Sequence, residues 1–365
     1  MHTVRFFPIG NADTCLIELE NGRRALFDFA DTHTDDQYDL RCDLEKELRD
    51  CLGDDKEIDV VAFTHLDTDH CARANEVFHL EHAEKYQGDG RIKIKTMWVP
   101  ATAILEVGVK GQARALRAEA RHRFINGQGI RVFGRPEQLD DFLVERGIEP
   151  AKRRNLISDA GNICPEFHID TDGLEFFVHS PFAEHCEGDL VMRNDSALFM
   201  QATFEVDGRK TRLILSADVT HEIIDDIVRV TRYHGNDERL EWDINNVPHH
   251  SSYLSLSFEK GDLKTTPVER LKWLYEHQGQ AGSLLVSTSC PISTEDNIQP
   301  PHRQAANYYK DVAKDHGGEW LVTMEHPKKS APKPLVIDIG GSGYKVRKIA
   351  GGANAVIGSA APRAG

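Results

Sequence analysis

The amino-acid sequence predicts an α/β protein with one large core and a mainly helical insertion. Short apolar runs typical of buried strands alternate with segments whose leucines recur at helical spacing. Several of these runs lead directly into His or Asp side chains, and the carboxyl ends of strands in open sheets are where binding and catalytic groups usually lie. Residues 102–160 differ, because they are mainly helical in pattern and rich in Arg.

The composition indicates a folded protein without a membrane segment. The chain has 365 residues, 40% of them hydrophobic, which is enough for a sizeable core. No window approaches the ~18 apolar residues of a membrane span, and the N-terminal residues lack the apolar region of a signal peptide. The 7 cysteines form no CxxC pair, a pattern typical of reduced, buried thiols. We therefore expect a cytoplasmic protein without membrane contact.

The net charge of −15 argues against a broad surface that binds nucleic acid electrostatically. It does not exclude a nuclease, because a catalytic cleft whose carboxylates hold a metal ion is itself acidic. A local basic patch could still guide the substrate.

The first part of the chain predicts a hairpin, a helix and a buried strand. Strands are expected at residues 4–7, 14–19, 24–29 and 58–63. Asn21-Gly22 is typical of a tight hairpin turn, and residues 37–52 place Leu40, Leu44 and Leu48 at helical spacing.

The later elements follow the same alternation. Strands are expected at residues 93–100, 174–178, 196–204, 211–215, 284–287 and 320–324, and helices at residues 221–230 and 302–314. Residues 351–365 are small residues plus Pro and are predicted to be a disordered tail.

Residues 102–160 are predicted to form an insertion or lid on the core, with one basic helical face. That face combines Lys110, Arg114, Arg117 and Arg121, at i, i+4, i+7 and i+11. In a chain of negative net charge, this local excess favours contact with phosphates or a nucleic-acid backbone. The alternative is a solvated face, or one paired with acidic residues elsewhere in the fold.

The strongest functional signal directly follows the buried strand at residues 58–63. His65, Asp67, Asp69 and His70 lie within one short loop. Clustered carboxylates repel one another unless a cation collects them, so this loop predicts a metal site. The alternative is a solvated acidic loop with two incidental histidines.

Two further segments end in ligand-type residues. The apolar strand at residues 211–215 leads to Asp218, and residues 245–252 contain the pair His249 and His250. Strand ends that each deliver His or Asp could form a pocket at a common sheet edge.

The motif HLDTDH at residues 65–70, followed by Asp218 and by VPHHSS at residues 247–252, resembles the metallo-β-lactamase superfamily, whose usual first motif is HxHxDH. The resemblance is closest to the hydrolase domain of the bacterial DNA-uptake (competence) channel, where HxDxDH and a VPHHGS-like motif recur. It extends from about Phe6 to Met324, outside the insertion. Further matching segments are Gly10–Asp13 for a GQGD turn, Leu26–Asp28 for LID, Asn194–Ser196 for NDNS, and Asn297–His302 for NxxGHPH.

The resemblance implies an αββα four-layer sandwich over residues 1–350 and one or two divalent metal ions, Zn²⁺ or Mn²⁺, with Mg²⁺ as a further candidate. Carried over by position, it gives one metal ion to His65 and Asp67. It gives a second ion to Asp69, His70 and one of His249 and His250, with Asp218 bridging both.

This sequence departs from the family pattern at three places. Asp67 replaces the second His of the usual motif, which makes the site richer in oxygen and shifts the preference from zinc alone toward Mn²⁺ or Mg²⁺. The His that other members supply on a middle strand is not evident, and Asn194, Asp195 or His179 could stand there as metal or substrate ligands. Ser251 replaces a Gly near the expected substrate.

We therefore expect a metal-dependent hydrolase, with a phosphodiesterase or nuclease favoured and a nucleic acid or nucleotide as substrate. Asp69 would orient the attacking water and take its proton. The spare His of the 249/250 pair, or His302, would protonate the leaving oxygen; His302 could equally be a helix-start residue. Hydrolysis of a lactone, thioester or other acyl substrate is the alternative, and a non-catalytic binding module is less favoured. The sequence does not identify a protein partner.

Overall fold

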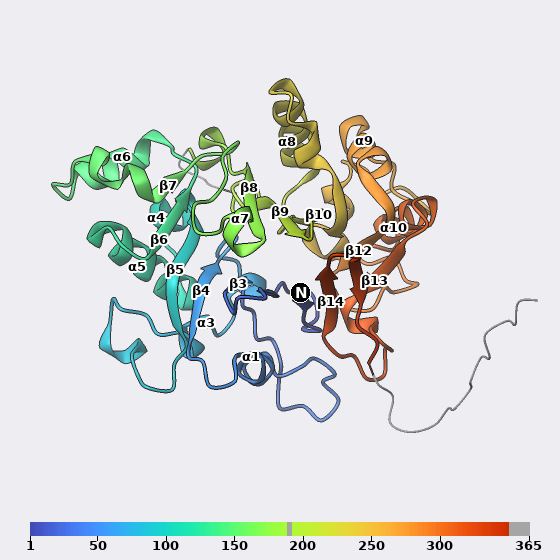
Figure 1. The fold of residues 1–365 in the computed structure, drawn as a ribbon, viewed down its shortest axis with the longest axis horizontal. Coiled ribbons are helices and arrows are strands. Elements are labelled where there is room, and N and C mark those ends of the chain that lie inside the picture. Colours follow the sequence, from blue (N-terminus) through green and yellow to red (C-terminus); the bar gives the residue numbers. More distant parts are fainter. Residues whose placement is uncertain (188–191, 350–365) are drawn as a thin grey trace, which may run out of the picture.

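The computed structural model describes residues 1–187 and 192–349, and its strands form two sheets (Figure 1). One sheet has nine strands in the order β15-β14-β1-β2-β3-β4-β5-β6-β7, and the other has six in the order β13-β12-β11-β10-β9-β8. The nine-stranded sheet contains β1 (His2–Phe6), β2 (Cys15–Glu18), β3 (Arg24–Phe27), β4 (Glu57–Ala62), β5 (Lys93–Pro100), β6 (Ile130–Phe133), β7 (Ile157–Ser158), β14 (Leu335–Gly340) and β15 (Gly343–Val346). The six-stranded sheet contains β8 (Leu174–Ser180), β9 (Phe199–Val206), β10 (Arg209–Leu215), β11 (Trp242–Asn246), β12 (Gly279–Ser287) and β13 (Glu319–Val322).

The helices lie between these strands in the chain. The α-helices are α1 (Leu44–Leu52), α2 (Thr68–Cys71), α3 (Ala74–Val77), α4 (Ala101–Leu105), α5 (Gly111–Asn126), α6 (Glu137–Val144), α7 (Ile169–Asp172), α8 (His221–Tyr233), α9 (Glu269–His277) and α10 (Arg303–Asp315). The 3₁₀ helices are η1 (Glu84–Tyr86), η2 (Pro150–Leu156), η3 (Ala183–Cys186), η4 (Asp237–Leu240), η5 (His249–Ser251), η6 (Tyr253–Ser255) and η7 (Thr323–Glu325).

Three apolar cores hold four layers together. The central core lies between the sheets, where Phe27 and Trp98 of one sheet meet Phe176 of the other. A second core joins the outer face of the nine-stranded sheet to α1, α3, α4, α5 and α6, and a third joins the six-stranded sheet to α8, α9 and α10. Figure 1 shows these two helical layers on opposite sides of the molecule. The predicted α/β class and αββα layering are therefore confirmed.

The strand directions explain where polar loops gather. From β3 to β7 the neighbouring strands of the first sheet are parallel, as are β10 to β13 of the second sheet. Parallel strands place their carboxyl ends at one edge of a sheet. Consequently the loops that follow β4, β10 and β11, which carry the predicted metal ligands, leave their sheets at such edges.

Every strand predicted from the sequence is present, with its ends shifted by a few residues. The predicted helix at residues 37–52 is shorter, because α1 begins only at Leu44. The side chain of Asp43 accepts a hydrogen bond from the backbone N–H of Lys46 and caps the helix there. Leu40, which the prediction placed on the helix, precedes the cap and is 48% exposed.

The segment 102–160, predicted as a mainly helical insertion or lid, is continuous with the core. It contains α5, α6 and most of α4, but also β6 and β7, which extend the nine-stranded sheet. Leu116 and Phe124 of α5 lie in the same core as Leu48 of α1. The segment is thus part of the outer layer rather than a separate cover, because its apolar face is buried against the sheet.

Two other expectations concern the chain ends and the membrane. The predicted disordered tail, residues 351–365, lies outside the described residues. Within residues 1–187 and 192–349, none of the helices has the length and apolar character needed to cross a membrane.

Candidate metal centre

The loop after β4 is held in place by backbone contacts with the N-terminal loops. The N–H of Asp13 donates to the carbonyl of Asp69 at 3.0 Å, and the N–H of Phe29 donates to the carbonyl of His70 at 3.1 Å. Asp69 and His70 lie in α2, a single helical turn that follows Asp67. The local fold therefore turns the side chains of residues 69 and 70 toward the edge of the second sheet.

Four of the predicted ligands come together at this edge. One ligand atom from each of Asp69, His70, Asp218 and His250 lies within 4.8 Å of all the others. Nε2 of His70 is 3.2 Å from Oδ1 of Asp218, and Nε2 of His250 is 3.3 Å from Oδ2 of Asp69. We refer to these residues as the four-residue cluster.

The chemistry of the cluster fits a divalent cation. Among the described residues, Nε2 of His70 and Oδ1 of Asp218 have no hydrogen-bond partner, although both atoms are buried and face each other. Leaving a buried polar atom unpaired costs about 1–3 kcal/mol. Two carboxylates and two imidazoles are a donor set used by Zn²⁺ and Mn²⁺, and their charge of −2 would balance one such ion.

Both cluster histidines are oriented by partners behind them. Nδ1 of His70 donates to Oδ2 of Asp28 at 2.7 Å, and Nδ1 of His250 donates to the carbonyl of Thr288 at 2.8 Å. With the proton fixed on Nδ1, each ring presents Nε2 to the cluster, which is the arrangement that metal-binding histidines use.

The pKa shifts report a strongly negative site. Burial alone would lower the pKa of His70, but the carboxylates of Asp218 and Asp28 outweigh it and raise that pKa well above its ordinary value. Burial would also lower the pKa of His250. The charge of Asp218 and the hydrogen bond with Asp69 outweigh burial and raise that pKa to about 9. Positive charge is therefore favoured at this point of the structure.

The turn that carries His250 has unusual backbone geometry. His249, His250 and Ser251 all have positive φ, at 50°, 51° and 68°. Non-glycine residues in this region cost of order 1–3 kcal/mol each, and such strain clusters at functional sites. A Gly, which the resembled motif has at position 251, adopts this conformation without strain, whereas Ser251 adds a Cβ. The hydroxyl of Ser251 shares a hydrogen bond of 2.7 Å with the hydroxyl of Ser287. The N–H of His249 also bonds the carbonyl of Ala217 at 2.9 Å, which joins the two strand ends.

His65 and Asp67 lie beside the cluster but form a different set of contacts. Nε2 of His65 is 3.5 Å from Oδ2 of Asp67, and the His65 ring lies 4.0 Å from that of His70. Oδ1 of Asp67 accepts a hydrogen bond from Nη1 of Arg193 at 2.5 Å. Arg193 was not predicted from the sequence, although it directly precedes the Asn194-Asp195 segment in which a further ligand was sought.

Asn194 and Asp195 occupy a turn before β9. The N–H of Asp195 donates to the carbonyl of Met192, and the carbonyl of Asn194 accepts from Ala197. Burial, with the charge of Glu222, raises the pKa of Asp195. Within the part of the chain that the structure describes, Asp195 belongs to neither group of His, Cys, Asp and Glu side chains that could hold a metal ion.

His249 and His302, the two candidate proton donors, differ in whether their ring nitrogens are free to reach a substrate. Nε2 of His249 lies 3.6 Å from Oδ2 of Asp218, and its side chain is 21% exposed. His302 is at the N-cap position of α10, where Nδ1 accepts from the N–H of Tyr253 and Nε2 donates to the carbonyl of Ile298. Both ring nitrogens of His302 are thus bound to backbone, which favours its interpretation as a helix-start residue over that of a proton donor.

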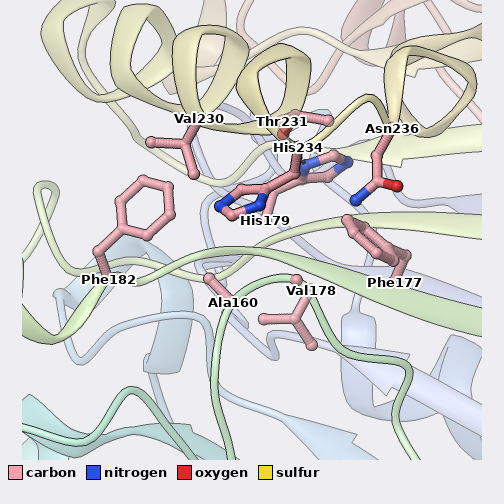
Figure 2. A pocket seen from close by; sticks show the side chains of 10 residues that line it. Ala160, Phe177, Val178, His179, Phe182, Val230, Thr231, His234 and Asn236 are labelled. Atoms are coloured by element: carbon pink, nitrogen blue, oxygen red, sulfur yellow. Dashed lines mark hydrogen bonds between the residues drawn. The ribbon is translucent and has the colours of Figure 1, made fainter.

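His179 lies in a separate cavity of about 520 Å³ between β8 and α8 (Figure 2). Its Nδ1 bonds Oγ1 of Thr231 at 3.2 Å, its Nε2 donates to the carbonyl of Arg239 at 2.9 Å, and burial lowers its pKa to about 4. Phe177 and Phe182 share this lining. His179 therefore does not lie with the four-residue cluster, and both its ring nitrogens are hydrogen-bonded elsewhere.

The predicted basic face of α5 divides into two pairs. Arg117 donates to the carbonyl of Glu106, and Nε of Arg121 donates to the carbonyl of Ile104 at 2.7 Å, so both satisfy the carboxyl end of α4. Lys110 and Arg114 are exposed. Only the second pair is presented to solvent in the way that contact with phosphates requires.

Comparison with known proteins adds little to this geometry. No protein-family model and no curated protein sequence matches the chain. Among solved structures, a diphosphatase described as a new member of the PhnP family matches with a TM-score of 0.33 and 11% identity, over 83% of this chain and 93% of that one. Zinc-bound PqqB from Methylobacterium extorquens matches with a TM-score of 0.37 and 11% identity, over 93% and 100%. Similarities this low carry no conclusion about activity.

Proposed function

We propose that this protein is a metal-dependent hydrolase of the metallo-β-lactamase type that acts on phosphodiesters. The observation that carries the proposal is the convergence of Asp69, His70, Asp218 and His250, with buried ligand atoms that have no hydrogen-bond partner among the described residues. The sequence resemblance supports it, because these four positions are ligand positions of that superfamily.

The chain's own groups have separate roles in this proposal. When bound, a divalent cation would activate water and stabilise negative charge on a phosphoryl oxygen. Oδ2 of Asp69 faces His250, so we assign Oδ1 of Asp69 to accept the proton of the attacking water. We assign proton donation to the leaving oxygen to Nε2 of His249, which is partly exposed, rather than to His302, whose ring nitrogens are engaged.

Three features favour a phosphodiester over an acyl substrate. The carboxylates of Asp69 and Asp218 make the cluster rich in oxygen, which suits Mn²⁺ as well as Zn²⁺. The motifs resemble most closely those of the hydrolase domain of the DNA-uptake (competence) channel. Lys110 and Arg114 are exposed cations that could contact the phosphates of a nucleic acid or nucleotide.

The test measures hydrolysis and metal content together. Purified protein is supplied with Zn²⁺, Mn²⁺ or Mg²⁺ and assayed on bis(p-nitrophenyl) phosphate, DNA, RNA and p-nitrophenyl acetate. Asp218→Asn should lose bound metal and lower kcat by more than the ~10–100-fold typical of a lost supporting residue. Asp243→Asn, a buried aspartate of β11 bonded to the N–H of Arg212, is the matched control and should retain both.

Two outcomes contradict the proposal. Cleavage of the acyl ester without cleavage of any phosphodiester would favour the acyl alternative. Full activity of Asp218→Asn would exclude the metal-dependent reaction altogether.

A further inference from the structure

Arg193 makes an unusually complete set of contacts beside the four-residue cluster. Its Nη1 donates to Oδ1 of Asp67 and to the carbonyl of Leu66 at 2.9 Å. Its Nε and Nη2 donate to the carboxylate of Glu106, at 3.0 Å and 2.7 Å. Arg193 thus joins the signature loop to the residue that ends α4, with its side chain only 25% exposed.

The His65–Asp67 half of the signature loop offers two potential ligands, fewer than the four of the cluster. Within residues 1–187 and 192–349, the two groups of three or more potential ligands contain neither His65 nor Asp67. Catalytic zinc sites use three protein ligands, and this half offers two. One oxygen of Asp67 instead accepts a hydrogen bond from the guanidinium of Arg193.

The charges lead to the same conclusion. The carboxylates of Asp69 and Asp218 together match one divalent ion, whereas Asp67 already lies within hydrogen-bond distance of the Arg193 guanidinium, which it shares with Glu106. The guanidinium charge is permanent, so Asp67 has a positive partner whether or not a metal ion is bound nearby.

We propose that the protein binds a single divalent metal ion, at Asp69, His70, Asp218 and His250, and that Arg193 supplies the second positive charge, at the His65–Asp67 half of the site. This rests on the proposed metal-dependent function. It makes Arg193 a positioning residue that fixes Asp67 and sets the number of ions bound.

Metal binding itself tests the proposal, without any substrate. The protein is stripped of metal, dialysed against Mn²⁺ and, separately, Zn²⁺, and bound metal is measured by elemental analysis and calorimetric titration. The wild type should bind one ion per chain. Two ions of comparable affinity would overturn the proposal.

Variants locate the effect at Arg193. Arg193→Gln keeps hydrogen-bonding capacity but removes the charge, so a second, weaker ion should bind; an unchanged stoichiometry up to millimolar Mn²⁺ would overturn the proposal. Arg193→Lys should restore binding of one ion. In Arg193→Gln/Asp67→Asn the second ion should be lost again, because its carboxylate is gone. Arg239→Gln, which breaks a similarly buried pair with Glu175, is the control and should bind one ion.

Asp67→Asn alone separates the two halves of the site. It should bind one ion with a Kd within about 3-fold of the wild type, since Asp67 lies outside the cluster; loss of that ion would show that Asp67 is its ligand. Thermal unfolding and circular dichroism establish that each variant is folded.

Failure of this inference and failure of the proposed function are distinguishable. A protein that binds one ion but hydrolyses no phosphodiester refutes the function and leaves the stoichiometry standing. A protein that binds two ions and hydrolyses phosphodiesters refutes the stoichiometry and leaves the function standing.

Discussion

At the scale of single residues, the site depends on which ring nitrogen of each histidine carries the proton. Asp28 is central to this choice, because its carboxylate accepts from Nδ1 of His70 and also from the N–H and hydroxyl of Thr64. A carboxylate offers only acceptors, so it selects the tautomer whose Nε2 lone pair faces Asp218.

Asp28→Asn should therefore weaken metal binding although Asp28 is not one of the four cluster residues. The amide can turn its NH₂ group toward Nδ1 of His70 and favour the opposite tautomer, with a proton on Nε2. We expect a loss of about 10–100-fold in Mn²⁺ or Zn²⁺ affinity, measured by competition with a chelating dye. An affinity equal to that of Asp243→Asn would contradict this role.

At the scale of elements, α5 shows how one charged face serves two purposes. Arg121 lies along the helix with its guanidinium on the carbonyl of Ile104 and 5.3 Å from the ring centre of Phe142, whereas Arg114 is exposed. The same residue type therefore stabilises the packing of α4 at one position and is available to a ligand at another.

Arg121→Ala should lower the free energy of unfolding by about 1–3 kcal/mol, because a buried carbonyl loses its charged donor. Arg114→Ala should change it by less than about 0.5 kcal/mol, as is usual at exposed sites. Urea denaturation followed by circular dichroism compares the two. Equal losses would mean that Arg114 is also part of the packing.

At the scale of the whole molecule, the two sheets are joined by aromatic side chains. Trp98 is fully buried and meets Phe27 and Phe133 of its own sheet and Phe176 of the other, each at an edge-on angle. Within the described residues its Nε1 has no hydrogen-bond partner, so packing alone accounts for its contribution.

Trp98→Ala should cost about 3–5 kcal/mol of stability, because the cavity would open between the sheets. Trp98→Phe should cost clearly less, since it keeps a ring and removes a buried N–H without a partner. Equilibrium unfolding in guanidinium chloride measures both. Similar losses for the two variants would show that the size of the indole, rather than the presence of a ring, is what the core requires.

The sequence predicted the layers and much of the site because those signals are local. Strand periodicity and the clustering of His65 to His70 are visible within a few residues. Arg193 was not visible in this way, because its partner Asp67 lies 126 residues earlier and only the folded chain brings them together. The same limit applies to β14, which pairs with β1 at the other end of the chain.

Local patterns also misled where a polar contact decided the outcome. The spacing of Leu40 continued the helical pattern, but the cap by Asp43 begins the helix after it. The sequence is compatible with His302 as a proton donor or as a helix-start residue, and in the structure its ring nitrogens bond backbone groups of two neighbouring segments. The sequence pattern does not reveal the start of α1 or the contacts of His302, because each depends on which partner a side chain reaches in the folded chain.

The four-residue cluster draws on both sheets: Asp69 and His70 follow a strand of one, and Asp218 and His250 follow strands of the other. An ion held there acts as a cross-link between the two halves of the sandwich. Folding and metal binding then become linked equilibria, in which stability grows with the logarithm of free metal concentration above Kd. The supply of metal in the surroundings would thus set what fraction of the protein is folded as well as whether it reacts.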